Sequence, residues 1–162
     1  GHVARKYVST PLDGITRRAT TAGVRVLSSP TNSTADAVAV AKEADMTIVV
    51  AGSMGQEGED RKSLYLDDNV DELIEGLAIA NCKNIVVLMQ VPGTILMPWR
   101  GKVAGIMVMF TGGQETGNAW ADVLFGDHSP SGRLPIMMPA TEDDVIKIST
   151  NKTVRYTEGL KT

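Results

Sequence analysis

The chain has 162 residues, of which 43% are hydrophobic and 22% are charged, and its formal net charge is -3. This length allows one domain with a substantial core and gives no sign of a second one. The absence of basic or acidic blocks excludes the charged surface that nucleic-acid or anionic-membrane binding requires, and no apolar run is long enough to span a bilayer. Because Cys82 is the only cysteine and there are only two histidines, we expect no disulfide, no metal site and no cofactor.

The first element expected along the chain is a helix that begins after Thr10. Threonine can cap a helix, the proline that follows is tolerated in the first turn, and Asp13 is placed to answer the cap. Gly23 can end this helix in a left-handed conformation. A short β-branched stretch from Val24 to Leu27 follows.

Strands and helices are expected to alternate through the rest of the chain. Three nearly all-apolar stretches have the composition of strands buried on both faces, namely Met46 to Ala51, Ile85 to Met89 and Ile106 to Phe110. Three segments have alanine-rich or apolar faces at helical spacing, namely Ala37 to Ala44, Asp67 to Ala80 and Thr116 to Phe125. A capping pattern from Ser33 to Asp36 precedes the first of them. This alternation predicts an α/β fold, in which a mostly parallel sheet is covered by helices on both faces and residues 1–162 form a single domain. The polar stretch from Thr141 onward is expected to be irregular.

A glycine-rich, acidic loop from Gly52 to Leu66 is expected between the first strand and the next helix. Ligands gather outside the carboxyl ends of strands in open α/β sheets, and this loop begins at such an end. The close spacing of Glu57, Glu59 and Asp60 disfavours ionisation of all three, so one carboxyl group can remain protonated and serve as a general acid. The alternative is a solvated loop in which Asp60 and Arg61 form a structural ion pair, and spacing alone favours that alternative.

Two other interpretations of this region are weaker. The glycines at 52, 55 and 58 suggest a phosphate-binding turn, but no helix begins at the third glycine and three carboxylates would repel a phosphate. Glu115 and Glu57 would make the pair of carboxylates that glycoside hydrolysis uses. A glutamate at a helix start is also stabilised by the helix dipole and by exposed N–H groups, so we assign Glu115 and Gln114 structural roles. Trp99 and Trp120 are expected in a core or at a domain seam.

Short motifs in a fixed order cover nearly the whole chain. They are Tyr7–Ile15, Ile48–Gly52, Glu57–Arg61, Leu64–Leu66, Met97–Trp99, Gly113–Gly117, Ala121–Asp127, Ser129–Pro135 and Tyr156–Gly159. Together they resemble the C-terminal α/β sandwich domain of family 3 glycoside hydrolases, the β-glucosidase and β-xylosidase type. The run from Ala121 to Pro135 is the most specific part of the resemblance.

The resemblance implies a retaining mechanism, in which an aspartate on an N-terminal barrel is the nucleophile and a glutamate of the sandwich domain is the acid/base. The matching position is the glutamate of a Glu-Gly-x-Asp-Arg pattern, which is Glu57, and a shift to Glu59 is the alternative. Asp60 and Arg61 would complete the substrate loop. The implied partners are a β-glucoside or β-xyloside and the barrel domain itself. Three departures accompany the resemblance: the barrel and its nucleophile are absent, the first strand of the sandwich is missing, and Gly112-Gly113 replaces the usual proline before Gly-Gln-Glu.

Two classes of function therefore remain open. The chain is expected either to supply Glu57 to an active site shared with a barrel, or to serve carbohydrate binding or assembly without chemistry of its own. An oligomer is compatible with both. Asn32 and Asn151 each begin an N-glycosylation triplet, which suits a secreted protein, but such triplets also arise by chance in polar loops. A secreted, periplasmic or vacuole-like location stays open.

Overall fold

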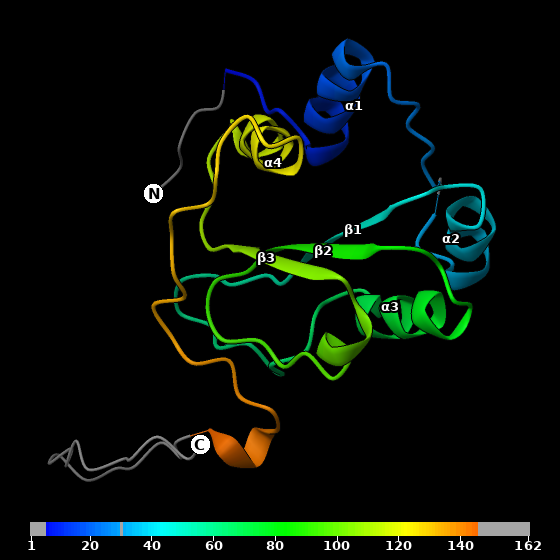
Figure 1. Ribbon diagram of the computed structural model, residues 1–162. Coiled ribbons are helices and arrows are strands. Elements are labelled where there is room, and N and C mark those ends of the chain that lie inside the picture. Colours follow the sequence, from blue (N-terminus) through cyan, green and yellow to red (C-terminus); the bar gives the residue numbers. More distant parts are fainter. Residues whose placement is uncertain (1–5, 30, 146–162) are drawn as a thin grey trace, which may run out of the picture.

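The computed structural model describes residues 6–29 and 31–145 and shows a three-stranded sheet with helices on both faces (Figure 1). The strands are β1 (Thr47–Gly52), β2 (Ile85–Gln90) and β3 (Gly105–Met109), which lie in the order β1-β2-β3 and are mutually parallel. Helices α1 (Pro11–Ala22) and α4 (Thr116–Leu124) cover one face, and α2 (Thr34–Ala41) and α3 (Val70–Ile79) cover the other. Two short 3-10 helices are η1 (Arg100–Lys102) and η2 (Glu142–Asp144). The predicted α/β fold with parallel strands is confirmed, and residues 6–10, which precede α1, form no strand.

The central strand β2 contributes to a separate core on each face of the sheet. Successive side chains of a strand point to opposite faces. Val87 and Met89 therefore pack against the α2 and α3 side, in the same cluster as Ile74 of α3. Leu88 packs on the other side with Ile15 of α1 and Trp120 of α4. Burial on both faces explains the nearly continuous apolar sequence of β2. The expectation of the same burial for the outer strands was wrong, because Val50 of β1 is exposed and every residue of β3 is only partly buried.

Helices α1 and α4 touch through their backbones. A Cβ atom on Gly14 would lie 2.1 Å from the carbonyl oxygen of Gly117, and one on Gly117 would lie 2.0 Å from the carbonyl oxygen of Thr10. The Ser9 N–H donates to the Gln114 carbonyl (2.8 Å), and the Gly117 N–H donates to the Ser9 carbonyl (2.9 Å). The N-termini of both helices are thereby held side by side.

The ends of α1 agree with the capping prediction. The Thr10 hydroxyl accepts a hydrogen bond from the Asp13 N–H (3.2 Å), and Gly23 follows the helix with a φ of 69°. The β-branched stretch from Val24 to Leu27 forms no strand, and Val24 is exposed.

Two predicted helix boundaries were wrong. Helix α2 begins at Thr34, and its cap Ser33 accepts a hydrogen bond from the Asp36 N–H, as the capping pattern predicts, but the helix ends at Ala41 and not at Ala44. Helix α3 begins at Val70 because Asp68 and Asn69 have φ angles of 58° and 56°, which a right-handed helix does not contain.

The polar C-terminal stretch contains η2, and the motif Tyr156–Gly159 and the triplet at Asn151 lie outside the described residues. Among residues 6–29 and 31–145, no helix has both the length and the apolar character needed to cross a membrane.

Candidate functional site

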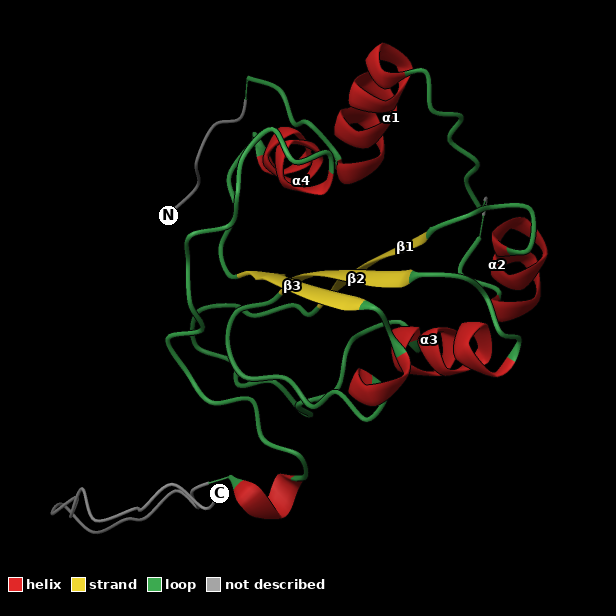
Figure 2. Ribbon diagram, viewed as in Figure 1, coloured by secondary structure: helices red, strands yellow, loops and turns green. Residues whose placement is uncertain are grey.

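The carboxyl ends of the three strands meet at one edge of the sheet, from which three loops start (Figure 2). This edge is where ligands bind in open α/β sheets. The longest of these loops is the segment from residue 53 to residue 66, called the acidic loop below. Its base is closed, because the Asp67 N–H donates to the Gly52 carbonyl (3.1 Å) and the Met54 N–H donates to the Asp67 carboxylate (2.6 Å). The two ends of the acidic loop are therefore hydrogen-bonded to each other at the end of β1.

Glu57 lies at the tip of a tight turn inside the acidic loop. Gln56 and Glu59 form an antiparallel bridge across the turn, and the Gln56 amide donates to the Glu59 carboxylate. Gly58 has a φ of 81° whereas the φ of Glu57 is not positive, which fits a type II turn with glycine at its third position. Glu57, Glu59 and Asp60 are all exposed. The turn thus presents the Glu57 carboxyl group to solvent, while Glu59 is held by Gln56.

Arg61 joins the acidic loop to the loop that follows β2. Its Nη2 donates to the Thr94 carbonyl oxygen (2.8 Å). Its Nη1 is buried and has no hydrogen-bond partner in the described part of the chain. No ion pair forms between Arg61 and Asp60, whose carboxylate is exposed. The expected structural ion pair between these two side chains is therefore wrong, and Arg61 contacts backbone instead.

The sequence analysis missed Asp71, a buried carboxylate that is hydrogen-bonded to the last residue of the acidic loop. Asp71 is 8% exposed, and its carboxylate accepts hydrogen bonds from the Leu66 N–H (3.0 Å) and from the Trp99 indole N–H (2.5 Å). Burial raises the pKa of Asp71, and the hydrogen bonds from Trp99 and Leu66 partly offset that effect. Asp71 lies in the first turn of α3, where carboxylates are common, so its sequence position did not single it out. Trp99 is fully buried, as predicted.

Glu115 lies at the N-cap position of α4, one residue before the first turn. Its side chain makes no capping hydrogen bond to the helix backbone, so the expected acceptance of backbone N–H groups is wrong. It accepts instead from the Asn118 side-chain amide (2.5 Å). Gln114 provides its carbonyl to Ser9, as described above. Both residues make hydrogen bonds at the start of α4, and neither is hydrogen-bonded to the acidic loop.

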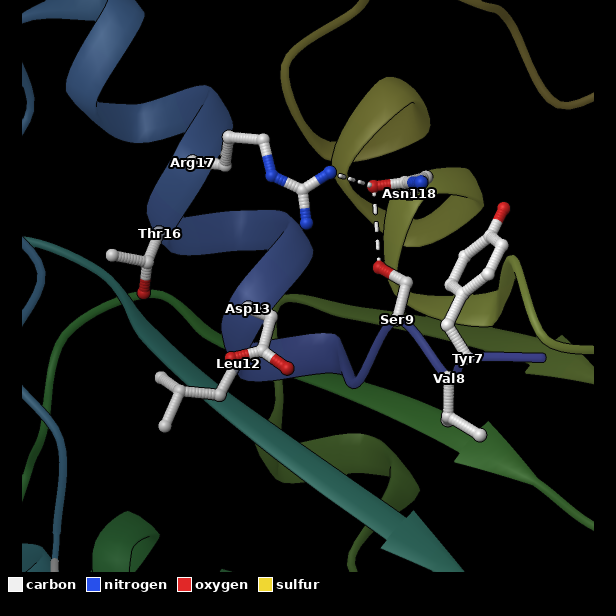
Figure 3. A pocket seen from close by; sticks show the side chains of 8 residues that line it. All are labelled: Tyr7, Val8, Ser9, Leu12, Asp13, Thr16, Arg17 and Asn118. Atoms are coloured by element: carbon white, nitrogen blue, oxygen red, sulfur yellow. Dashed lines mark hydrogen bonds between the residues drawn. The ribbon is translucent and has the colours of Figure 1, made fainter. Parts of the chain in front are cut away.

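An open hollow of about 630 Å³ lies beside the N-terminus of α1 (Figure 3). Tyr7, Leu12 and Arg17 line it, together with Asn118 of α4. The Asn118 side-chain oxygen accepts hydrogen bonds from the Arg17 guanidinium (3.0 Å) and from the Ser9 hydroxyl (3.2 Å). No residue of the acidic loop lines this hollow, so the two features are separate. In the part of the chain that the structure covers, no group of three or more His, Cys, Asp or Glu side chains could hold a metal ion.

A family model described as the glycosyl hydrolase family 3 C-terminal domain matches residues 1–162. The chain belongs to glycoside hydrolase family 3. It is similar to a β-glucosidase of Rhizobium radiobacter, with 42% identity over 137 residues that cover 78% of this chain and 17% of that protein. It is also similar to a β-glucosidase of Schizophyllum commune, with 37% identity over 171 residues that cover 95% of this chain and 89% of that sequence.

Solved structures of family 3 enzymes have the same fold. A β-glucosidase of Chaetomella raphigera matches 89% of this chain with a TM-score of 0.78 and 32% identity. A β-D-glucoside glucohydrolase of Trichoderma reesei matches 93% of this chain with a TM-score of 0.78 and 30% identity. The family 3 chain spans 22% and 23% of these two structures, and 17% of the R. radiobacter relative.

Proposed function

We propose that this family 3 domain supplies the general acid/base of a retaining β-glycosidase, with Glu57 as the reacting group. The observation that supports this most directly is the turn from Gln56 to Glu59. It places the Glu57 carboxyl group in solvent at the carboxyl edge of the sheet, and no other side chain of the described residues is hydrogen-bonded to it. The carboxylate of Glu59, the alternative acid/base, accepts a hydrogen bond from the Gln56 side-chain amide.

The proposed chemistry needs two carboxyl groups, and Glu57 provides one of them. In the first step Glu57 donates its proton to the glycosidic oxygen as the carbon–oxygen bond breaks and an aspartate from the barrel bonds to the anomeric carbon. In the second step the Glu57 carboxylate removes a proton from the water that displaces the aspartate. Because the two carboxyl groups of a retaining enzyme lie about 5 Å apart, the barrel must sit against this edge of the sheet. Asp60 and Arg61 belong to the same proposed substrate loop.

The proposed substrate is a terminal β-linked glucose residue, because the relatives named above are β-glucosidases. A β-linked xylose is the second candidate that the family resemblance implies. The 162-residue chain alone should not turn over either substrate, because the proposed nucleophile belongs to the barrel.

The test joins this chain to the remainder of the R. radiobacter enzyme, in place of the part that the chain matches. Glu57→Gln should lower kcat/KM for alkyl β-glucosides or cellobiose by about two to four powers of ten, because their leaving groups need a proton. The formation of the glycosyl intermediate from 2,4-dinitrophenyl β-glucoside should be affected far less. Azide should restore part of the activity, since it attacks the intermediate without a general base.

Glu59→Gln is the matched variant, because it alters the same kind of side chain two residues away in the same turn. It should retain most of the activity toward all these substrates. If Glu59→Gln shows the leaving-group pattern and Glu57→Gln does not, the acid/base is Glu59. If neither variant shows it, the domain does not supply the acid/base and the non-catalytic function is the better hypothesis.

A further inference from the structure

The part of the acidic loop that carries Glu57 makes few contacts with the rest of the protein. At the entry, Gly55 packs against Pro92, so that a Cβ on Gly55 would lie 2.9 Å from the Pro92 side chain. At the exit, the Leu64 carbonyl accepts from the Leu96 N–H (2.9 Å). Within residues 56–63, all of which the structure describes, the hydrogen bond that reaches outside the acidic loop is the one from Arg61 to Thr94.

The Arg61 guanidinium is oriented by backbone atoms. Its Nη2 donates to the Thr94 carbonyl at 2.8 Å and lies 3.8 Å from where a Cβ would stand on Gly93. A guanidinium donates its hydrogen bonds in fixed directions within its plane, so this contact restrains the group. Its Nη1 atom is buried, so this end of the guanidinium is shielded from water.

Ion pairing within the acidic loop does not explain this arrangement. The loop contains three carboxylates, and none of them forms an ion pair with Arg61. The contact with Thr94 lies four residues after Glu57 along the chain, on the side of the turn that Gly55 does not support. Within residues 56–63, Arg61 is therefore the residue whose hydrogen bond connects the turn to the loop after β2.

We propose that Arg61 is a positioning residue, which sets the place of the Glu57 carboxyl group by fastening the acidic loop to the Thr94 carbonyl after β2. The inference rests on the proposed function of Glu57. A misplacement of about 1 Å in a catalytic group can cost about a hundredfold in rate. Loss of the Arg61 contact should therefore weaken proton donation by Glu57 without removing the carboxyl group.

The first experiment compares Arg61→Met with Lys62→Met in the joined enzyme described above. Lys62 is the neighbouring cation and is exposed, so its replacement removes the same charge without removing a contact to the β2 loop. Arg61→Met should lower kcat/KM for alkyl β-glucosides by about 10- to 100-fold, with a much smaller effect on 2,4-dinitrophenyl β-glucoside. Lys62→Met should leave both rates nearly unchanged. Arg61→Lys, which keeps a charged donor, should recover part of the loss.

A double-mutant cycle separates positioning from a general structural role. If Arg61 acts through Glu57, adding Arg61→Met to Glu57→Gln should cause no further loss for alkyl β-glucosides. If the two losses multiply, Arg61 acts independently of Glu57 and the inference is wrong, while the proposed function of Glu57 still stands. If Glu57→Gln alone has no effect, the proposed function has failed instead.

The placement of the turn can also be measured without turnover, on the 162-residue chain. In NMR spectra, Arg61→Met should shift the backbone amide signals of residues 56–59 and leave those of β3 in place, which also shows that the variant is folded. Lys62→Met should move the signals of residues 56–59 less. Unchanged signals there in a folded Arg61→Met chain would refute the positioning role.

Discussion

Replacing Trp99 with phenylalanine removes the indole N–H that holds Asp71 at the exit of the acidic loop. The change should lower the free energy of unfolding by about 2–4 kcal/mol. Leaving a buried polar group without a partner costs about 1–3 kcal/mol, and water cannot easily replace the indole because Asp71 is 8% exposed. The smaller ring also leaves a cavity around a fully buried site, which adds about 1 kcal/mol.

Urea unfolding at pH 7 measures this loss, with far-UV circular dichroism as the signal, which is the same in both variants. With an m-value of about 2 kcal/mol per molar urea, the midpoint should fall by about 1–2 M. Trp120→Phe is the matched control, because Trp120 is 4% exposed and its indole makes no hydrogen bond within the described residues. It should lose only the cavity contribution of about 1 kcal/mol. Equal losses in the two variants would show that the hydrogen bond to Asp71 contributes nothing.

Two further predictions concern stability. Burial raises the pKa of Asp71 above the unfolded value of about 3.9, so protonation of Asp71 favours the folded state. This stabilisation is complete below a pH of about 3.9 and is lost as the pH rises through the pKa of the folded state. The advantage of the natural chain over Asp71→Asn in urea unfolding should therefore shrink from pH 4 to pH 8, and a constant difference would contradict this. Gly14→Ala would place a methyl group 2.1 Å from the Gly117 carbonyl oxygen and should cost about 1–3 kcal/mol in thermal unfolding. Gly132→Ala is the control, because no atom lies within 4 Å of the added carbon, and it should barely change Tm. Equal shifts in Tm for Gly14→Ala and Gly132→Ala would mean that α1 and α4 can separate freely.

The elements that were predictable from sequence are those whose causes are local. Each strand has a nearly continuous apolar run, which is visible without knowledge of its neighbours, although only β2 is well buried on both faces. The start of α1 follows from Thr10 and Asp13, which lie three residues apart, and its end follows from Gly23. The stretch from Val24 to Leu27 shows the opposite case, because β-branched residues form a strand only where another strand is available to pair with them.

The contacts of the candidate site depend on distant parts of the chain. Composition singled out the acidic loop, and the resemblance singled out Glu57 within it. The partner of Arg61 is a backbone carbonyl 33 residues away, and Trp99 lies 28 residues from Asp71. A carbonyl carries no side-chain signal, and a carboxylate in the first turn of a helix is unremarkable. Sequence alone therefore paired Arg61 with its neighbour Asp60, which was wrong.

The closed base of the acidic loop has a consequence for how this fold can change in evolution. Since Gly52 and Asp67 are hydrogen-bonded to each other, residues inserted between them lengthen the loop without separating β1 from α3. Each doubling of a flexible loop costs only about 0.6 kcal/mol in closure entropy. Insertions and deletions in this segment can therefore reshape the surface at the carboxyl edge of the sheet while the sheet and its two cores are inherited intact.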